Sequence, residues 1–329
     1  MNKIYLTGAG GFIGSRFLEF MVKTGFAGEI ICPVRGDYAF KVNEINKSAN
    51  FYSADLNDKD SVARGMKGCD TVFHFAAKAS MRKGKGTYST NVIGTKNIVD
   101  AANDSGSVKK IIFLSTIWAV DRSPYDTCSV PLDDDSECIP STAYGRSKYE
   151  GELIIKKSGI PYVIFRLPPV YGPGSKPNYF VSRLILGIKN SNPLYRIAFP
   201  AKISLLYIDD IVEACYLSGM KDDIRNGAFF LSSSNAVSIS DIIKEIIKEL
   251  GLSTAPLDIN EGLVKLLKSA FCSKALRHIV PPEWKSIILD YLVCDSSGFK
   301  KVSGFQPSVD MKEGICETVK WYRESGWPQ

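Results

Sequence analysis

Short runs of β-branched and aromatic residues alternate with longer segments of helical periodicity along the first half of the chain. The short runs are residues 4–7, 30–34, 50–54, 71–75, 110–115 and 162–166. Between them, apolar residues recur at three- and four-residue spacing in residues 14–24, 59–66, 87–105 and 143–158. Strands that alternate with helices in this way are typical of a parallel sheet built from β-α-β units. We therefore expect an α/β fold with a doubly wound parallel sheet of the Rossmann type.

This pattern changes near residue 168. Pro, Gly and Asn become frequent over residues 168–178, and helical periodicity dominates later segments such as residues 240–250 and 310–324. We predict a Rossmann domain over residues 1–167 and a smaller, mainly helical substrate lobe over most of residues 168–329. Residues 204–232, approximately, are expected to return to the first domain.

Glycines follow the first predicted strand directly, with Gly8, Gly11 and Gly14 at three-residue spacing. Glycine is needed where the backbone turns with positive φ, approaches a diphosphate closely, or lets a helix pack on a strand. The helix that begins here would direct free N–H groups and a partial positive charge at the phosphates. We predict a dinucleotide-binding turn that includes Phe12 and Ile13; a purely structural glycine-rich turn is the alternative.

The end of the second predicted strand bears on the type of dinucleotide. An acidic side chain here would accept hydrogen bonds from a ribose 2′-hydroxyl, whereas an arginine would pair with a 2′-phosphate. Arg35 comes first and Asp37 lies farther along the chain. NADP(H) is therefore favoured and NAD(H) is the alternative, although a solvated loop arginine would give the same sequence.

Two further segments carry candidate catalytic groups. Tyr144 and Lys148 begin a predicted helix, and their four-residue spacing places them on one face. A tyrosine hydroxyl has a pKa of about 10, and a neighbouring ammonium together with a bound nicotinamide would favour its ionised form. Ser115 and Thr116 end the fifth strand, where chemistry collects in a parallel sheet. Thr116, Tyr144 and Lys148 form a candidate proton-handling triad, for which a chance Tyr-x-x-x-Lys pair is the alternative.

Several motifs together resemble the extended short-chain dehydrogenase/reductase superfamily, in particular its NAD(P)-dependent nucleotide-sugar epimerase/dehydratase/reductase group. The motifs are residues 7–14, 55–56, 74–77, 91–95, 115–116, 144–148, 166–174 and 204–210, which span nearly the whole chain. By this resemblance, Tyr144 is the acid/base and Lys148 holds the nicotinamide ribose. Thr116 takes the place of the family's Ser/Thr, and Asn91 supports the architecture of the active site.

The resemblance also implies further contacts with the cofactor. Asp55 and Leu56 would face the adenine. The remaining candidates are Ala76, Ala77, Lys78, Asn91, Ser115, Pro168 and Val170. His74 lies in one of these motifs, and we expect it to be a buried, hydrogen-bonded strand residue and no catalyst.

Departures from the family pattern narrow the reaction. Family 4,6-dehydratases resemble one another in placing Asp-Glu after the catalytic threonine, whereas Ile117 and Trp118 follow Thr116 here. The segment 292–297 is similar to bacterial reductases of nucleotide-linked 4-keto-6-deoxy sugars. The leading hypothesis is therefore reduction of a 4-keto hexose carried on UDP or a similar nucleotide, for surface polysaccharide precursors. A UDP-hexose 4-epimerase is the first alternative, and a non-catalytic NADP(H)-binding sensor or scaffold is the second.

A nucleotide-sugar substrate brings a diphosphate, so the second lobe should offer cations. Ile203 occupies the position where family epimerases carry an arginine, which leaves Arg196, Lys202 and Lys78 as candidate substrate contacts. Residues 263–278 combine helical apolar spacing with Lys265, Lys268, Lys274 and Arg277. We expect an amphipathic helix over the substrate cleft and favour this over a membrane-surface helix.

Composition excludes several other classes. The chain has 329 residues, a net charge of +6, eight scattered cysteines and two histidines, which predicts neither a metal site nor a disulfide framework. Residues 133–137 are expected to form a solvated acidic loop. We find no basic stripe with aromatics for nucleic acid, no membrane-spanning run and no signal peptide, so a cytoplasmic enzyme is expected. The resemblance implies a homodimer through residues 87–105 and 143–158.

Overall fold

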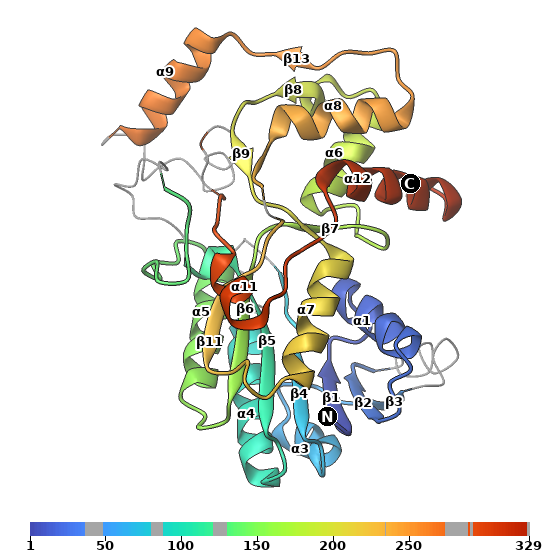
Figure 1. The fold of residues 1–329 in the computed structure, drawn as a ribbon, viewed down its shortest axis with the longest axis vertical. Coiled ribbons are helices and arrows are strands. Elements are labelled where there is room, and N and C mark those ends of the chain that lie inside the picture. The colour runs from blue at the N-terminus through green and yellow to red at the C-terminus, as the bar shows by residue number, and fades with distance from the viewer. Residues whose placement is uncertain are drawn as a thin grey trace.

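A seven-stranded, wholly parallel sheet forms the centre of the larger part of the molecule (Figure 1). The computed structural model describes residues 1–36, 49–79, 88–120, 130–233, 235–273, 289 and 292–327. The strands are β1 (Lys3–Thr7), β2 (Glu29–Val34), β3 (Asn50–Ser53), β4 (Thr71–His74), β5 (Lys110–Thr116), β6 (Tyr162–Leu167) and β11 (Gly227–Phe230). Their order is β11-β6-β5-β4-β1-β2-β3, so the direction of winding reverses between β1 and β4. This order confirms the predicted doubly wound fold.

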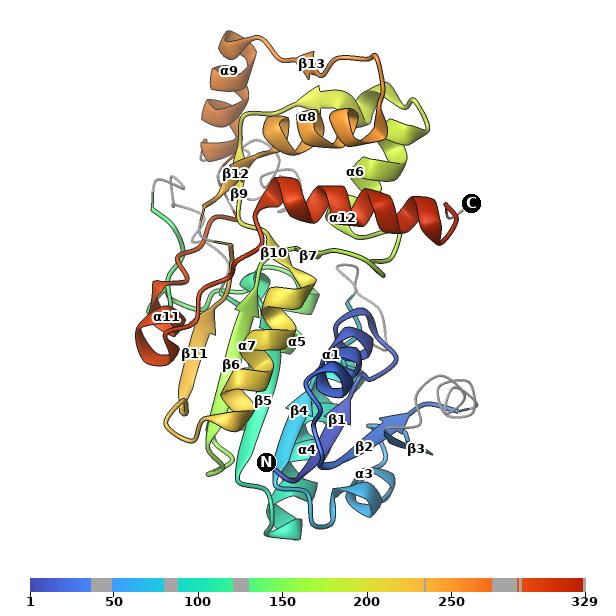
Figure 2. The ribbon, with the colours of Figure 1, turned by 45° about the vertical axis from the view of Figure 1, so that its right-hand side comes forward.

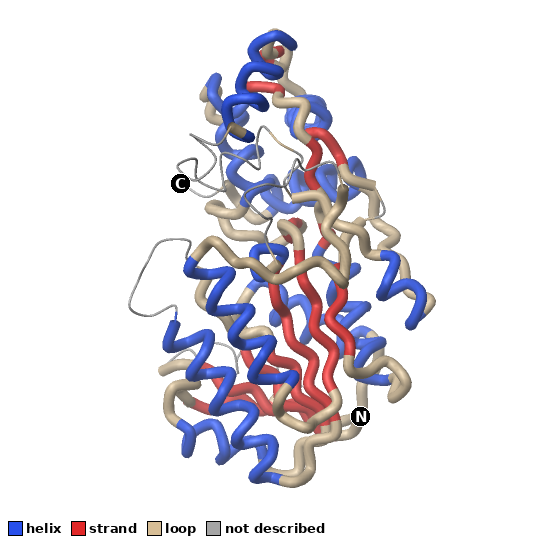
Figure 3. The backbone as a smooth tube through the Cα atoms, turned by 90° about the vertical axis from the view of Figure 1, so that its left-hand side faces the viewer, coloured by secondary structure: helices blue, strands red, loops and turns tan. Residues whose placement is uncertain are grey.

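Helices cover both faces of this sheet (Figure 3). One face carries α1 (Phe12–Lys23) and α7 (Ile208–Met220), and the other carries α3 (Lys59–Met66), α4 (Gly94–Ser105) and α5 (Ala143–Lys156). The π-helix η1 (Ser89–Ile93) leads into α4, and the 3-10 helix η2 (Ile117–Ala119) follows β5. Strand side chains alternate between two cores, so that Ile4 and Leu6 join one and Tyr5 joins the other.

The remaining elements are short strands and helices, most of which form the smaller lobe at the carboxyl ends of the sheet strands (Figure 2). They are β7 (Val170–Tyr171), α6 (Phe180–Lys189), η3 (Pro193–Arg196), β8 (Ile197–Ala198), β9 (Lys202–Ile203), β10 (Leu206–Tyr207), β12 (Val237–Ser238), α8 (Ile239–Leu250), β13 (Leu257–Asp258), α9 (Glu261–Cys272), α11 (Ser297–Ser303) and α12 (Met311–Glu324). In this lobe α8 packs against α6 and α12, whereas α11 packs on β11. The chain leaves the sheet after β6 and returns to it through α7 and β11.

A buried ion pair joins α5 to the sheet. Glu152 on α5 is fully buried and Arg166 on β6 is 3% exposed, with Arg166 Nη2 lying 3.0 Å from Glu152 Oε2. Ser115 at the end of β5 donates its hydroxyl to Glu152 Oε1 at 2.6 Å. Because each buried charge has partners, the pair can hold α5 in register with β5 and β6.

The acidic loop at residues 133–137 differs from the sequence-based expectation. Asp134 is half-buried, its Oδ1 accepts a hydrogen bond from the Phe230 N–H at 2.7 Å, and burial raises the pKa of its carboxyl to about 6. Its carbonyl accepts from Arg166 Nη1 at 3.2 Å. The loop is therefore not simply solvated, because Asp134 anchors it to β6 and β11.

The predicted basic helix at residues 263–278 is observed in part as α9, and residues 274–278 lie outside the described residues. Val264 is buried, whereas Leu263 and Leu266 are 48% and 65% exposed. The apolar face is thus only partly covered in the described chain. Among all described residues, no helix is both long and apolar enough to cross a bilayer.

We expect the Glu152→Ala substitution to destabilise the fold strongly, because it leaves Arg166 charged and buried without its main partner. The free energy of unfolding, measured by urea denaturation with circular dichroism, should fall by about 3–5 kcal/mol. Lys156→Ala is the matched control, since Lys156 lies 3.7 Å from the same carboxylate but is 32% exposed. Its cost should be below about 1 kcal/mol. An equal cost for both variants would contradict this account of the pair.

Candidate active site

The glycine-rich turn joins β1 to α1 at the point where the winding of the sheet reverses. Gly8 has φ +76°, and a Cβ on it would lie 2.8 Å from the Ala76 nitrogen. Gly11 donates its N–H to the Gly8 carbonyl at 2.8 Å, and a Cβ on Gly14 would collide with the same carbonyl. The turn is therefore pressed onto the end of β4 and onto α1, with no room for side chains at these two glycines.

The start of α1 fits an anionic ligand. Its first turn consists of Phe12, Ile13, Gly14 and Ser15, so the free N–H groups keep their partial positive charge for an incoming group. Phe12 is 9% exposed and packs edge-on against Tyr179, with 5.7 Å between ring centroids, and Ile13 is half-buried. Together with the close-packed glycines, this arrangement fits the diphosphate of a dinucleotide.

Asn91 on η1 joins the loop after β4 to α5. Its Oδ1 accepts from the Lys78 N–H at 2.8 Å, and its Nδ2 donates to the Lys78 carbonyl at 3.2 Å and to Ser147 Oγ at 2.9 Å. Asn91 itself is 2% exposed. Ala76 is half-buried, and Ala77 and Lys78 are exposed. Asn91 thus holds the loop after β4 and α5 in place relative to each other. All three of its contacts are with groups beside the predicted site.

Tyr144 and Lys148 lie one turn apart at the beginning of α5. The helix is capped by Thr142, whose Oγ1 accepts from the Gly145 N–H at 2.9 Å. Tyr144 is half-buried, and its carbonyl accepts from Ser147 Oγ at 2.8 Å. Lys148 is 2% exposed, and its Nζ lies 3.8 Å from the centre of the Phe113 ring. The ammonium is therefore held against an aromatic face inside the protein.

Burial dominates the electrostatics of this pair. Removal from water raises the pKa of Tyr144, with a further increase from neighbouring Tyr179. It lowers the pKa of Lys148 to about 7, against the opposing effect of Glu152. In the chain by itself, burial thus favours the protonated phenol. The predicted effect of Lys148 applies together with a bound nicotinamide and stays a prediction. A further positive charge beside the tyrosine is needed to favour its ionised form.

The two hydroxyls at the end of β5 have different surroundings. The Ser115 hydroxyl donates its proton to Glu152. Thr116 is 6% exposed and begins η2, where its Oγ1 accepts from the Trp118 N–H at 3.4 Å and keeps its own proton to donate. The start of α5 packs on η2 so closely that a Cβ on Gly145 would collide with the Trp118 carbonyl. Thr116 and the first turn of α5 therefore lie close together.

The other predicted cofactor residues follow the carboxyl ends of β2, β3 and β6. Arg35 is exposed directly after β2, and Asp37 falls outside the described residues. Asp55 is exposed after β3, and the Leu56 carbonyl accepts from Asn97 Nδ2 at 2.8 Å. These positions follow the two strands beyond β1, on the opposite side from β5. After β6, Pro168 is buried and Val170 is half-buried.

Two of the three candidate substrate cations, Arg196 and Lys202, belong to the smaller lobe. Arg196 ends η3, and its Nε is buried without a hydrogen-bond partner among the described residues. Lys202 is exposed on β9. A buried guanidinium nitrogen without a partner is costly, so Arg196 is the stronger candidate for an anionic ligand.

Some residues of the site could have been found by spacing along helices. Glu152 lies four residues after Lys148, and Thr95 lies four residues after Asn91. Thr95 Oγ1 donates to the Asn91 carbonyl at 2.6 Å. Ser147 lies within the motif at residues 144–148, but its contact with Asn91 was not predicted, because only the fold brings η1 beside α5.

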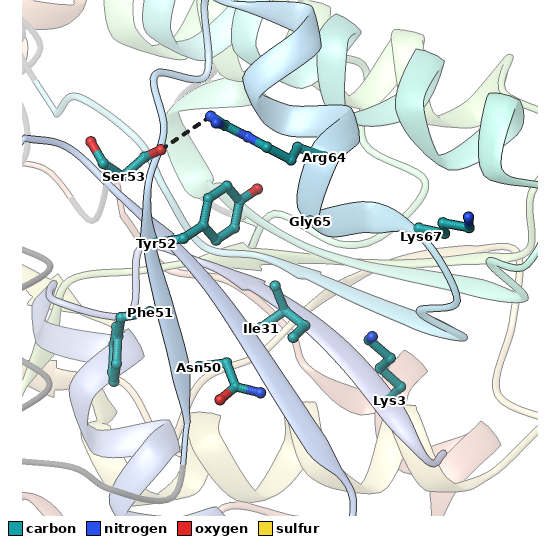
Figure 4. A pocket seen from close by; sticks show the side chains of 9 residues that line it. All are labelled: Lys3, Ile31, Asn50, Phe51, Tyr52, Ser53, Arg64, Gly65 and Lys67. Atoms are coloured by element: carbon teal, nitrogen blue, oxygen red, sulfur yellow. Dashed lines mark hydrogen bonds between the residues drawn. The ribbon is translucent and has the colours of Figure 1, made fainter.

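A cavity of about 700 Å³ lies elsewhere, between β2, β3 and α3 (Figure 4). Its lining includes Lys3, Asn50, Tyr52 and Arg64, and none of its nine residues is among the predicted site residues. Within the part of the chain that the structure describes, no group of three or more His, Cys, Asp and Glu side chains could hold a metal ion.

Comparisons with known proteins identify the family of this chain and proteins that share its fold. The model of the NAD dependent epimerase/dehydratase family matches residues 4–228. The UDP-glucose 4-epimerase of Vibrio cholerae is 27% identical over 98% of this chain and 96% of its own length. The UDP-glucuronic acid 4-epimerase of Bacillus cereus, solved with UDP-glucuronic acid and NAD, has a TM-score of 0.77 at 23% identity, covering 98% of this chain and 100% of that chain. The dTDP-glucose 4,6-dehydratase of Bacillus anthracis, solved with NAD, also has a TM-score of 0.77, at 16% identity and 98% and 97% coverage.

The family match includes the glycine-rich turn, the Asn91 contacts and the beginning of α5. The two solved structures share the fold over almost the whole chain. The chain therefore belongs to the NAD dependent epimerase/dehydratase family, a group of enzymes of the extended short-chain dehydrogenase/reductase superfamily.

Proposed function

We propose that this enzyme is an NAD(P)-dependent oxidoreductase that reduces a 4-keto (6-deoxy) hexose carried on UDP or a similar nucleotide. The observation that carries the proposal is the gathering of Thr116, Tyr144 and Lys148 where β5 ends and α5 begins. Two proton-bearing hydroxyls and a buried amine lie there on elements that Asn91 and Glu152 hold in place. This set suits the interconversion of a carbonyl and an alcohol.

Each residue would have a distinct task in this reaction. When bound, the nicotinamide supplies or accepts the hydride. Tyr144 would donate its phenolic proton to the oxygen of the former carbonyl. Thr116 would donate a hydrogen bond to the same oxygen and stabilise its developing negative charge. Lys148 would move from the Phe113 face to the ribose hydroxyls, and its charge beside Tyr144 would favour loss of the proton.

Dehydration of the sugar is disfavoured by the residues after Thr116. Elimination of water needs an acid and a base beside the sugar, but Ile117 and Trp118 fill the two following positions and are 1% and 8% exposed. Neither side chain can transfer a proton. These two positions therefore offer neither the acid nor the base that elimination needs, whereas hydride transfer does not depend on them.

For the cofactor, the solved relatives described above contain NAD. Arg35 nevertheless supports a preference for NADP(H), because an exposed guanidinium directly after β2 can pair with a 2′-phosphate. For the substrate, the buried Nε of Arg196, which has no hydrogen-bond partner among the described residues, supports a contact with the diphosphate. Lys202 and Lys78 are further candidates.

A UDP-hexose 4-epimerase is the second candidate. It is favoured by the similarity over the full chain to the UDP-glucose 4-epimerase of Vibrio cholerae. The same three residues would then assist transfer of the C4 hydride to the bound nicotinamide, with the hydroxyl proton passing to Tyr144, and its later return to the other face of the sugar. The two candidates differ in whether the cofactor is consumed.

The reaction can be assigned with a panel of UDP-sugars that includes 4-keto-6-deoxy intermediates. With added NADPH, we expect one mole of cofactor to be oxidised per mole of keto sugar. The loss of NADPH absorbance measures this oxidation, and the sugar product is identified separately. Interconversion of UDP-hexoses without net oxidation of cofactor would overturn reduction and establish the epimerase instead.

Tyr144→Phe should reduce kcat by about 10²–10⁴-fold, because it removes the phenolic proton donor. The aromatic ring of the residue is retained. Binding of the cofactor, measured by fluorescence titration, should change little. Tyr149→Phe is the matched control, since Tyr149 lies on the same helix outside the triad. Activity of Tyr144→Phe equal to that of the control would refute the assigned role.

Arg35→Asp should reverse the cofactor preference. Loss of a charge-assisted hydrogen bond to a 2′-phosphate should weaken kcat/KM for NADPH by about tenfold or more, while that for NADH falls less or rises. Lys23→Asp makes the same change of net charge at the far end of α1. It should leave the ratio of kcat/KM for NADPH to kcat/KM for NADH unchanged. If Arg35→Asp leaves this ratio unaltered, Arg35 does not contact the 2′-phosphate of the cofactor.

A further inference from the structure

A continuous series of buried hydrogen bonds crosses the molecule between the glycine-rich turn and the beginning of α5. At its centre, His74 on β4 is fully buried, with Nδ1 2.8 Å from Thr7 Oγ1 and Nε2 2.9 Å from Thr95 Oγ1. Thr7 is the residue before Gly8, and its Oγ1 also accepts from the Ala76 N–H at 3.1 Å. The imidazole therefore lies between β1 and α4 with a partner on each ring nitrogen.

The direction of these hydrogen bonds follows from the hydroxyl protons. Thr95 has one, and it is donated to the Asn91 carbonyl at 2.6 Å. Thr95 Oγ1 must therefore accept from His74, which places a proton on Nε2. Thr7 Oγ1 already accepts from Ala76, so its own proton is free for Nδ1. A neutral imidazole protonated at Nε2 satisfies every group in the series.

The surroundings also require a neutral ring. Phe113 packs on His74 with 5.3 Å between ring centroids, and the Lys148 Nζ lies 3.8 Å from the centre of the same Phe113 ring. Burial, and secondly the nearby Lys148 charge, lower the pKa of His74 to about 3. The imidazole is therefore uncharged throughout the range in which the enzyme can work.

On its other side the series reaches Tyr144. Asn91, whose carbonyl accepts from Thr95, donates its Nδ2 to Ser147 Oγ at 2.9 Å. Ser147 Oγ in turn donates to the Tyr144 carbonyl at 2.8 Å. His74 is thus linked, through Thr95, Asn91 and Ser147, to the backbone that carries the candidate acid/base.

Building on the proposed function, we propose that His74 is a positioning residue. Its neutral Nε2–H form fixes Asn91, and through it Tyr144, relative to the turn that binds the cofactor. Each ring nitrogen serves one side: Nδ1 holds the end of β1, and Nε2 holds η1 and α4. Because the network is buried and every member has a partner, a rotation of the ring would leave polar groups unsatisfied on both sides. The ring contacts no reacting atom, so its effect on catalysis is one of geometry.

The protonation state can be observed without any assay of activity. The chain has two histidines, His74 and His278, so ¹⁵N-histidine labelling gives two ring systems, and His278→Asn assigns them. We expect one protonated and one unprotonated nitrogen for His74 from pH 5 to 9, with the proton on Nε2. An imidazolium that titrates within this range, or a proton on Nδ1, would overturn the proposal even if the enzyme has the proposed activity.

Two substitutions separate the two sides of the ring. A glutamine amide can reach the position of Nε2 and keep the donor to Thr95, whereas an asparagine oxygen can replace Nδ1 and keep the acceptor for Thr7. His74→Asn should lower kcat by about 10- to 100-fold, since small displacements of catalytic groups have effects of this size, with KM and the cofactor dissociation constant little changed. His74→Gln should mainly weaken binding of the cofactor.

Equal losses of kcat and of cofactor affinity in both variants would contradict the proposal and leave a merely structural histidine. If either variant fails to fold, Thr95→Val tests the Nε2 side alone and should reproduce the loss of kcat; an unchanged kcat would overturn the proposal. Failure of the proposed function is distinguishable, because Tyr144→Phe would then keep its activity while the Nε2–H signal of His74 persists.

Discussion

The close approach of the glycine-rich turn to the end of β4 is the constraint on which the site depends. Because Gly8 and Gly14 have no side chains, the backbone after β1 can lie against Ala76 and pack α1 onto the sheet. This approach leaves the N–H groups of α1 directed at one place, the point where the winding of the sheet reverses. It also brings Thr7 beside His74, from which the hydrogen-bonded series to α5 begins.

Two buried polar connections then hold α5 in place from different sides. One passes through Asn91 and Ser147 to the backbone of Tyr144, and the other through Glu152 to Ser115 and Arg166. Because buried hydrogen bonds depend on distance and angle, these connections fix the position of α5 more narrowly than apolar contacts would. The first turns of α5 are thereby fixed relative to both the glycine-rich turn and the end of β5, which the proton transfer of the proposed reaction would require.

Removal from water shifts the pKa values of Lys148 and Tyr144. The same burial that fixes Lys148 lowers its pKa to about 7 and raises the pKa of Tyr144, so the tyrosine holds its proton in the chain by itself. Positive charge brought by the cofactor acts in the opposite direction. Under the proposed function, the ionisation of Tyr144 would thus depend on whether a dinucleotide is bound.

The sequence by itself determined the alternation of strands and helices, the glycine spacing and the Tyr-x-x-x-Lys pair, because each depends on residues near one another in the chain. It also assigned His74 correctly as a buried, hydrogen-bonded residue. Only the tertiary structure decided that Ser115 faces Glu152, that Asp134 is half-buried, and that burial raises the pKa of Tyr144. These depend on contacts between distant segments, and local periodicity carries no information about which side chains meet or how much water remains around them.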